Sequence, residues 1–282
     1  MRRRRLLGAL TAGVGAFGGC LDRARSDPGT ATDDETSTDG TTDDDGAYAG
    51  VTVERAEATP EYVASNSPDS IGTYGERDEQ YVIASVTADG TPAPPRAAFR
   101  LRIGDRSIPP TTEVGGMGER LWDYGDPYDS ENGEGWVAFE VAKPLDAEGA
   151  RLTWPGGGHE LDEGAVERLS RPPTTFEVRG FDAPESMALD ETVTAELTVA
   201  NVGDADGTFV AAVNRTGPSI AYTPEARISL DVPAGETTTW VYESGPDDRY
   251  ADPSDGSEGL QMIVRLRWRD GSLSREIAVE TE

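Results

Sequence analysis

The chain has 282 residues, a formal net charge of −28, one cysteine and one histidine. The acidic excess argues against nucleic-acid binding, because phosphates bind surfaces whose Lys and Arg release counterions. One cysteine excludes a disulfide framework and a thiolate zinc site, and one histidine excludes a multi-histidine metal site. The length suits an export segment, a linker and two modest domains, or one larger domain.

The N-terminus has the layout of a secretory signal. A run of arginines precedes a weakly apolar stretch at 6–17 and the small residues Gly18 and Gly19, which together give a basic n-region, a short h-region and a cleavage site. The apolar stretch is too short for a membrane span, which needs about 20 helical residues. Paired arginines ahead of such a stretch predict twin-arginine export. The arginines are Arg2, Arg3, Arg4 and Arg5.

The only cysteine, Cys20, follows this stretch. Residues 1–20 resemble a lipoprotein signal, in which a diacylglyceryl lipid alkylates the cysteine thiol and the cysteine becomes the mature N-terminus; Phe17 departs from the usual Leu. The resemblance implies lipid attachment at Cys20 and a protein held at the outer face of the cell membrane. The alternative is a soluble secreted protein whose cysteine has no role.

Residues 21–47 are expected to form a disordered acidic tether. Between Ser26 and Gly46 there are eight acidic residues, no basic residue and no large apolar side chain, so this stretch cannot bury a core and should be extended. It would act as a spacer, or alternatively as a solubilising tail. Lys143 is the only lysine beside 24 arginines, a balance that resembles exported proteins of extreme halophiles.

Residues 48–282 predict an all-β fold with two antiparallel β-sandwich domains, at 48–172 and 173–282, divided near Pro172 and Pro173. Apolar and polar residues alternate with period two between Gly, Pro and Asp turn signals. One short helix is expected at 163–169, and Asp270-Gly271 predicts a type I′ hairpin turn. The expected strands lie at 51–53, 80–88, 99–103, 137–141, 151–154, 176–178, 193–199, 209–213, 228–232, 237–242, 262–268 and 277–279.

Two resemblances refine this fold prediction. Residues 173–282 resemble the cell-adhesion-related domain of bacterial and archaeal surface proteins, on the turns Asn201-Val202-Gly203 and Ala234-Gly235-Glu236 and the strands beside them. This resemblance implies an immunoglobulin-like sandwich without disulfides. Residues 48–154 more loosely resemble the telokin-like immunoglobulin domain of secreted lipoproteins, on the strands at 51–53, 81–86 and 135–141. That family has no established activity, so the resemblance implies fold and location only.

The sequence offers no catalytic constellation. His159 is expected at the tip of a glycine-rich turn, as a solvated side chain without a triad around it. The segment 217–221 resembles a nucleophile elbow only superficially. A pair of carboxylates could act as in glycosidases, but 53 acidic residues prevent any selection. We therefore expect no enzymatic activity and no cofactor.

Two acidic loops, at 123–134 and 247–258, could supply oxygen ligands for calcium. Neither fits the calcium-loop pattern, so hydrated surface loops are favoured. Asn214-Arg215-Thr216 is an N-glycosylation sequon, which makes Asn214 a possible glycan site.

Two sets of strand arginines could bind anionic sugars or a partner. The favoured alternative is that they pair with acids on the same sheet. The arginines are Arg100, Arg102, Arg265, Arg267 and Arg269. Aromatic residues near turns could stack on sugars. The favoured alternative is that they cover a small core. These are Tyr48, Tyr62, Tyr74, Trp122, Tyr124 and Tyr128.

Together these features predict a membrane-anchored, exported lipoprotein that acts without catalysis in adhesion, scaffolding or another interaction. Its partners would be the membrane, through the lipid on Cys20, and a surface protein or a glycan. The alternative is a ligand- or cation-binding accessory subunit of a surface transporter or enzyme, and a carboxylate-based hydrolase is a third possibility.

The charge balance generates a prediction about salt. Self-repulsion of a chain carrying −28 charges is largely screened at about 1 M salt, where the Debye length is about 3 Å, but acts over about 30 Å at 0.01 M. We expect the folded part to lose its near-ultraviolet circular dichroism on dialysis into dilute buffer. Retention of the full signal in dilute buffer would contradict adaptation to salt.

Overall fold

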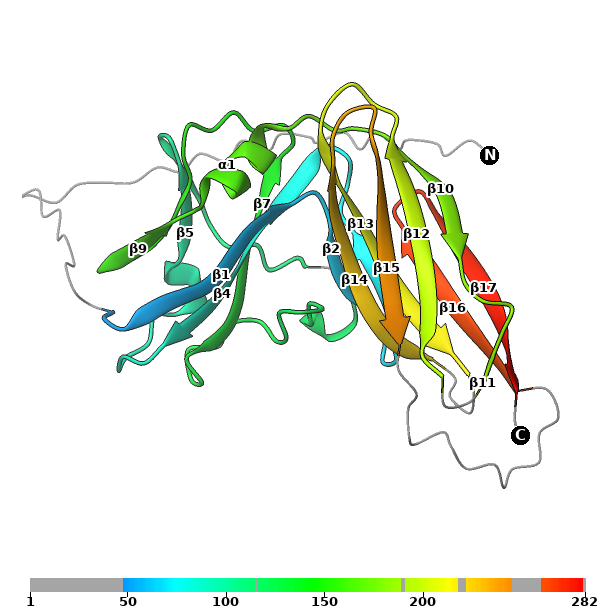
Figure 1. Cartoon of the computed structure of the whole chain (residues 1–282). Helices are drawn as coiled ribbons and strands as arrows, with labels where there is room; N and C mark the ends of the chain where they lie inside the picture. Colours follow the sequence, from blue (N-terminus) through cyan, green and yellow to red (C-terminus); the bar gives the residue numbers. More distant parts are fainter. Residues whose placement is uncertain (1–47, 115, 189–190, 218–221, 245–259, 281–282) are drawn as a thin grey trace, which may run out of the picture. The chain divides into compact units, whose positions relative to one another are not determined.

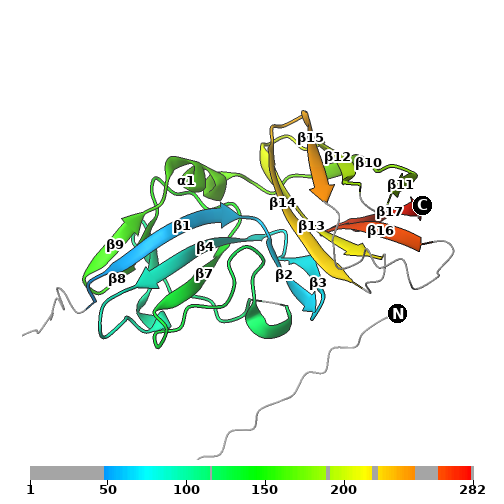
Figure 2. The same ribbon diagram turned by 60° about the horizontal axis from the view of Figure 1, so that its bottom comes forward.

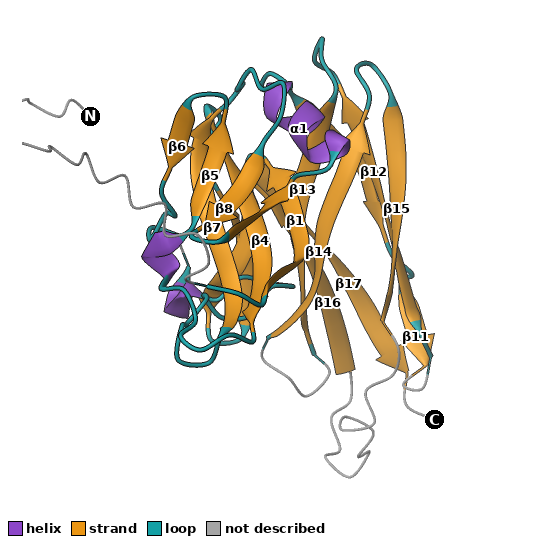
Figure 3. Cartoon of the chain, turned by 90° about the vertical axis from the view of Figure 1, so that its left-hand side faces the viewer, coloured by secondary structure: helices purple, strands orange, loops and turns teal. Residues whose placement is uncertain are grey.

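Strands dominate the architecture (Figures 1 and 3). The computed structural model describes residues 48–282 except 115, 189–190, 218–221, 245–259 and 281–282. Within these ranges the chain forms sheets that are antiparallel except for the parallel pair β11–β17, with one α-helix and two short 3-10 helices. The all-β prediction is confirmed. Cys20, the four N-terminal arginines and the tether lie outside the described residues, so their predicted roles stay predictions.

The elements fall into two groups on either side of Pro172 and Pro173, and each sheet draws its strands from one group. The first group comprises β1 (Val51–Thr59), β2 (Tyr62–Ser67), β3 (Ser70–Tyr74), β4 (Glu79–Ala88), η1 (Arg96–Ala98), β5 (Arg100–Ile103), β6 (Arg106–Ile108), η2 (Met117–Glu119), β7 (Glu134–Ala142), β8 (Arg151–Trp154), β9 (Gly157–Glu160) and α1 (Glu163–Ser170). The second comprises β10 (Phe176–Asp182), β11 (Ser186–Ala188), β12 (Val193–Asn201), β13 (Gly207–Thr216), β14 (Thr223–Val232), β15 (Thr237–Ser244), β16 (Leu260–Trp268) and β17 (Gly271–Glu280).

The helix α1 forms where the sequence predicts it. Asp162 caps its N-terminus, because the Ala165 backbone N–H donates to the Asp162 carboxylate at 2.7 Å. Ala165 and Leu169 lie on one face and are buried in the core of the first group. Arg171 has an extended backbone, and Pro172 follows it, so the helix ends there.

Figure 2 shows the sheet β1–β4–β7 of the first group, and its middle strand β4 is buried on both faces. Val82, Ala84 and Val86 of β4 face a core that includes residues of β5, β8 and α1. Tyr81 and Ile83, on the opposite face, pack against β2 and the loop before β7. A strand with two apolar faces reads as a continuous apolar run, which explains the segment QYVIASV at 80–86.

The second group is a sandwich of two sheets around one core. The strand orders are β10–β12–β15 and β11–β17–β16–β13–β14. Leu197 and Val199 of the first sheet share the core with Val213, Val264 and other residues of the second. Polar residues alternate with these on β12, as the period-two pattern predicts.

The two groups meet where the β2–β3 hairpin packs on the outer face of β13. Val63 and Ile71 form a buried cluster with Val210 and Ala212. The Asn214 amide closes this contact, since its oxygen accepts from the Ile71 N–H at 2.8 Å and its nitrogen donates to the Ile71 carbonyl at 2.9 Å. Because β13 also faces the sandwich core, it is buried on both sides.

The turns that carry the adhesion-domain resemblance lie together. Asn201 is 1% exposed, and its side-chain amide donates to the carbonyls of Ala205 and Val232. Its backbone N–H donates to the Glu236 carbonyl, and its own carbonyl accepts from the Gly235 N–H. One asparagine therefore fixes both turns at the same end of the sandwich.

Some sequence expectations are wrong in detail. The β16–β17 loop consists of Arg269 and Asp270, because Trp268 pairs with Gly271. Neither loop residue is among the described non-glycine residues with positive φ, so the turn is not type I′. His159 lies in strand β9 opposite Leu152, where a turn tip was expected. The strands β2, β3, β6, β9 and β11 were not anticipated.

The junction generates a mutational prediction. Asn214→Ala should lower the free energy of unfolding by about 1–3 kcal/mol, because the buried N–H and carbonyl of Ile71 lose their partners. Thermal melts in molar salt would measure the change. The matched control is Asn132→Ala, which removes an amide that is exposed and bonded only locally to Asp129. A loss no larger than that of the control would show that this contact does not hold the junction.

Candidate functional site

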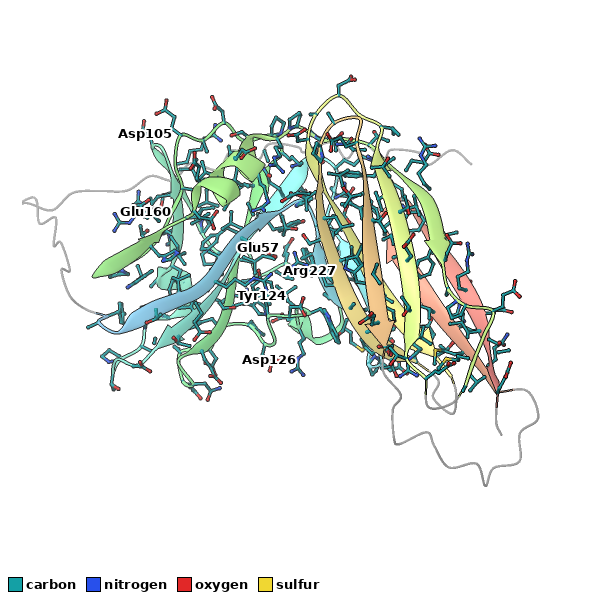
Figure 4. The ribbon with its side chains drawn as sticks, viewed as in Figure 1. Glu57, Asp105, Tyr124, Asp126, Glu160 and Arg227 are labelled. Carbon is teal, nitrogen blue, oxygen red and sulfur yellow. The ribbon has the colours of Figure 1, made fainter. Side chains whose placement is uncertain are left out.

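Three clusters of polar side chains in the described residues could carry a function. The first is an ionic cluster beside the junction, where Glu57 of β1 meets Arg227 of β14 (Figure 4). Their charged atoms are 2.6 Å apart, and Arg55 lies 2.8 Å from the same carboxylate. Burial opposes ionisation of Glu57, but Arg227 and Arg55 outweigh it and lower its pKa. Both charges are therefore kept, and the cluster joins the two groups.

Tyr124 completes this cluster without making it a catalytic site. The Arg55 guanidinium lies 4.6 Å from the centre of the Tyr124 ring. Burial, and then the charge of Glu57, raises the pKa of Tyr124. A phenol that holds its proton beside a carboxylate that stays ionised offers no group ready to exchange a proton near neutral pH. The arrangement is structural.

The second cluster surrounds a small cavity of about 40 Å³ between the groups, lined among others by Glu61, Arg77, Lys143 and Arg269. Glu61 is 7% exposed and lies 2.8 Å from the Arg269 guanidinium. Burial raises the pKa of Glu61 to about 7, although Arg269 opposes the shift. Burial also lowers the pKa of Lys143 to about 8, with Arg171 and Arg269 adding to the effect. The cavity has room for only a few water molecules.

The third cluster lines an open groove of about 860 Å³, here called the arginine groove. Its floor is the outer face of β16 and β17, and one wall is the turn between β2 and β3. The polar residues that define it are Asn66, Ser67, Ser70, Arg265, Arg267, Arg269, Ser272 and Ser274. It is the roomiest of the three clusters, and a small oligomeric ligand would fit it.

Strand geometry places two guanidinium groups on this floor. Val264 and Leu266 point into the sandwich core, so Arg265 and Arg267 point outward, about 7 Å apart along the strand. The antiparallel register sets Ser274 opposite Arg265 and Ser272 opposite Arg267. No acidic residue stands directly across from either arginine.

The charges of Arg265 and Arg267 are not matched by neighbouring acids. Neither forms an ion pair within the part of the chain that the structure describes. The Arg265 guanidinium lies 5.6 Å from the centre of the Tyr222 ring, and its Nε is buried without an acceptor among the described residues. The expectation that these two arginines pair with acids on their sheet is wrong, because their cross-strand neighbours are serines.

Other charged groups around the groove are already engaged. Arg269 contacts Glu61 and donates to the Pro60 carbonyl at 3.1 Å. Asp270 pairs with Arg77, and Asp69 in the β2–β3 turn accepts a hydrogen bond from Ser67. Among the described residues, Arg265 and Arg267 are therefore the two cations of the groove without an acidic partner, in a chain of net charge −28.

The first acidic loop lies apart from the arginine groove. In the first acidic loop, Asp126, Asp129 and Glu134 line a separate groove of about 620 Å³ with Glu54. No group of three or more His, Cys, Asp or Glu among the described residues could hold a metal ion. The second acidic loop and 218–221 lie outside the described residues. Asn214 is 4% exposed, and a glycan on its nitrogen would replace the hydrogen bond to Ile71.

The aromatic residues belong mainly to the cores, as favoured. Tyr62 and Tyr128 are buried, while Tyr74 and Tyr124 pack against the same cluster as Tyr62, and Trp122 packs at the junction. Tyr48 is half-buried.

The strand arginines of the first group lie elsewhere. Arg100 donates to nearby backbone carbonyls, and Arg102 lies across from Arg151, which pairs with Glu160. The residues that sequence reasoning missed are Ser272, Ser274 and the β2–β3 turn.

Comparisons with known proteins add no family. No family model and no curated protein matches the sequence. Among solved structures, the chain is 19% identical to a β-glucosidase from Listeria innocua in complex with glucose, over 64% of this chain and 22% of that one, with a TM-score of 0.32. It is 21% identical to β-glucosidase 3B from Thermotoga neapolitana in complex with glycerol, over 38% and 16%, with a TM-score of 0.31.

These structural likenesses carry no functional inference. The chain spans about a fifth or less of each glucosidase, at low identity and a low TM-score. No helix in the described ranges is both long and apolar enough to cross a membrane.

Glu61 generates a prediction about pH. Its folded-state pKa of about 7 exceeds its ordinary value of 4.5, so the folded state binds more protons between these values. Its contribution to stability is fully present below pH 4.5 and is lost as pH rises through 7, by about 3 kcal/mol. Glu61→Gln should remove this slope. Melting midpoints from pH 4.5 to 8, compared between the two proteins, would measure it, and identical slopes would contradict the assignment.

Proposed function

We propose that this chain is an exported, membrane-anchored lipoprotein that acts as a non-enzymatic binding protein in adhesion or surface scaffolding. Cys20 would carry the lipid, residues 21–47 would be the spacer, and the strands from 48 onward would present the binding surface. The observation that carries the proposal is the arginine groove. It holds two guanidinium groups without acidic partners among the described residues, on a chain that is otherwise strongly acidic.

The packing of the groove supports a binding role. Its floor belongs to a five-stranded sheet, and its wall is fixed by the buried contact between Ile71 and Asn214. Groups held on rigid elements lose little entropy when a ligand binds. A binding surface of this kind needs no reacting group, which is consistent with the structural role of the Glu57 cluster.

The finer fold assignment is part of the same proposal. We place residues 173–282 among immunoglobulin-like sandwiches of the cell-adhesion-related kind, and residues 48–172 in a second β-sandwich domain. The hydrogen bonds that join the turns at Asn201 and Gly235 support the first assignment. The alternative of a cation-binding accessory subunit gains no support from the acidic loop at 123–134.

A substitution at the anchor tests the proposed location. Cys20→Ser should abolish incorporation of labelled glyceride and move nearly all of the protein from the membrane fraction to the medium, because the lipid is the proposed anchor and no helix among the described residues could cross the membrane. Fractionation followed by immunoblotting would measure the shift. A chain that stays with the membrane after this substitution would contradict lipid anchoring.

Binding is tested with the released chain. Cys20→Ser protein added to isolated cell envelopes should bind them in molar salt, and Arg265→Glu with Arg267→Glu should abolish most of that binding. The same reversal at Arg100 and Arg102, which also lie two residues apart on a strand, is the matched control. Envelope binding that neither pair affects would exclude the arginine groove as the binding surface.

A further inference from the structure

The arginine groove indicates the chemical class of its ligand. Resting on the proposed binding function, we propose that it binds an acidic glycan, meaning a hydroxyl-rich oligosaccharide that carries carboxylate groups. Each part of this proposal corresponds to a feature of the groove: its two cations, the hydroxyl and amide groups between them, and the absence of an apolar anchor site.

The cations define the charged part of the ligand. A guanidinium fork matches a carboxylate bidentately, and Arg265 and Arg267 are spaced about 7 Å apart on one face of β16. Tyr222 beneath Arg265 orients its fork by a cation–π contact at 5.6 Å. Two carboxylates on a short oligomer could therefore be bound at once.

The neighbours of the arginines define the neutral part. Ser272 and Ser274 stand across from them on β17, and Asn66, Ser67 and Ser70 line the facing wall. Hydroxyl and amide groups both donate and accept hydrogen bonds, as the hydroxyls of a sugar require. A carboxylate without hydroxyls would use the arginines and leave these groups to solvent.

The apolar surface argues against a protein partner at this site. Protein interfaces depend on aromatic or aliphatic anchors that fill pockets. The exposed large hydrophobic residues of the described chain are Met117, Val202 and Val241, and none of them lines the groove. Of the apolar and aromatic residues that line the groove, Leu266 points into the sandwich core, Trp268 and Leu273 pack against it, Ile71 is buried at the junction, and the Arg265 guanidinium lies over the Tyr222 ring.

The charge of the whole chain restricts where such a ligand could bind. A chain of net charge −28 repels an anion over most of its surface. At about 1 M salt this repulsion is screened beyond about 3 Å. Direct hydrogen bonds between the ligand and the arginines of the groove act within that distance, so they persist. An acidic glycan should therefore bind at the groove and in concentrated salt.

The test is calorimetric titration of the full chain, carrying Cys20→Ser for solubility, with trigalacturonate in molar salt. Its methyl ester is the neutral control, and triglutamate supplies carboxylates without sugar hydroxyls. We expect trigalacturonate to bind, both controls to bind at least about tenfold more weakly, and Arg265→Gln with Arg267→Gln to weaken trigalacturonate by about tenfold or more. Arg100→Gln with Arg102→Gln should leave the affinity unchanged, and melting midpoints would show that all variants fold.

The other outcomes separate the two proposals. Equal binding of the methyl ester, or unchanged affinity in the Arg265 and Arg267 variant, would overturn the assignment of an acidic glycan to this groove. Tighter binding of triglutamate than of trigalacturonate would also overturn it. The groove would then be a site for anionic partners that are not glycans. If no probe binds but the Arg265→Glu and Arg267→Glu variant still loses envelope binding, the glycan class is wrong and the proposed function stands.

Discussion

The double burial of β13 is the constraint on which the rest of the structure depends. One face of this strand contributes Phe209, Ala211 and Val213 to the sandwich core, and the other packs Val210 and Ala212 against the β2–β3 hairpin. Its neighbours in the sheet are fixed by the same register. The described residues between 48 and 280 consequently belong to one compact unit, even though no sheet among them crosses Pro172 and Pro173.

This constraint also explains the choice of polar residues at the junction. A strand buried on both faces cannot leave a neighbouring backbone group unsatisfied, and the Asn214 amide supplies both a donor and an acceptor to Ile71. The ionic contacts between Glu57 and Arg227 and between Glu61 and Arg269 surround the apolar contact. They favour one arrangement of the two groups, since each charge has its partner across the junction.

Much of the fold could be predicted from the alternation of apolar residues. The strands around Val137, Val193 and Val264 and the helix at 163–170 appear where the pattern places them, because local burial and the Asp162 cap determine them. The β2–β3 hairpin could not be found in this way. Its segment 62–74 contains three serines among other small polar residues, and its few apolar residues are divided between two separate clusters. The apolar run FVAAV at 209–213 was the available sign of a strand with two covered faces.

Only part of the arginine groove could be predicted from the sequence. Alternation placed Arg265 and Arg267 on one face of their strand, but their neighbours depend on the register of β17. The loop of Arg269 and Asp270 sets that register, and the predicted turn at Asp270-Gly271 would have shifted it by two residues, with Ser274 opposite Arg267 and Glu276 opposite Arg265. Because side chains alternate with a period of two, this shift keeps the same residues on each face, but it would have set a carboxylate instead of a serine across from Arg265. The facing wall of the groove belongs to the β2–β3 hairpin, which is far away in the sequence.

The solitary lysine has a practical consequence. Lys143 is half-buried beside the cavity between the two groups, and its amine carries a lowered pKa. Reagents that modify amines would therefore attach at a single side chain, next to the surface where the two groups meet. A fluorophore attached to Lys143 would report separation of the two groups, whether or not the sheets themselves unfold. Most proteins carry many exposed lysines and cannot be labelled at one chosen lysine in this way.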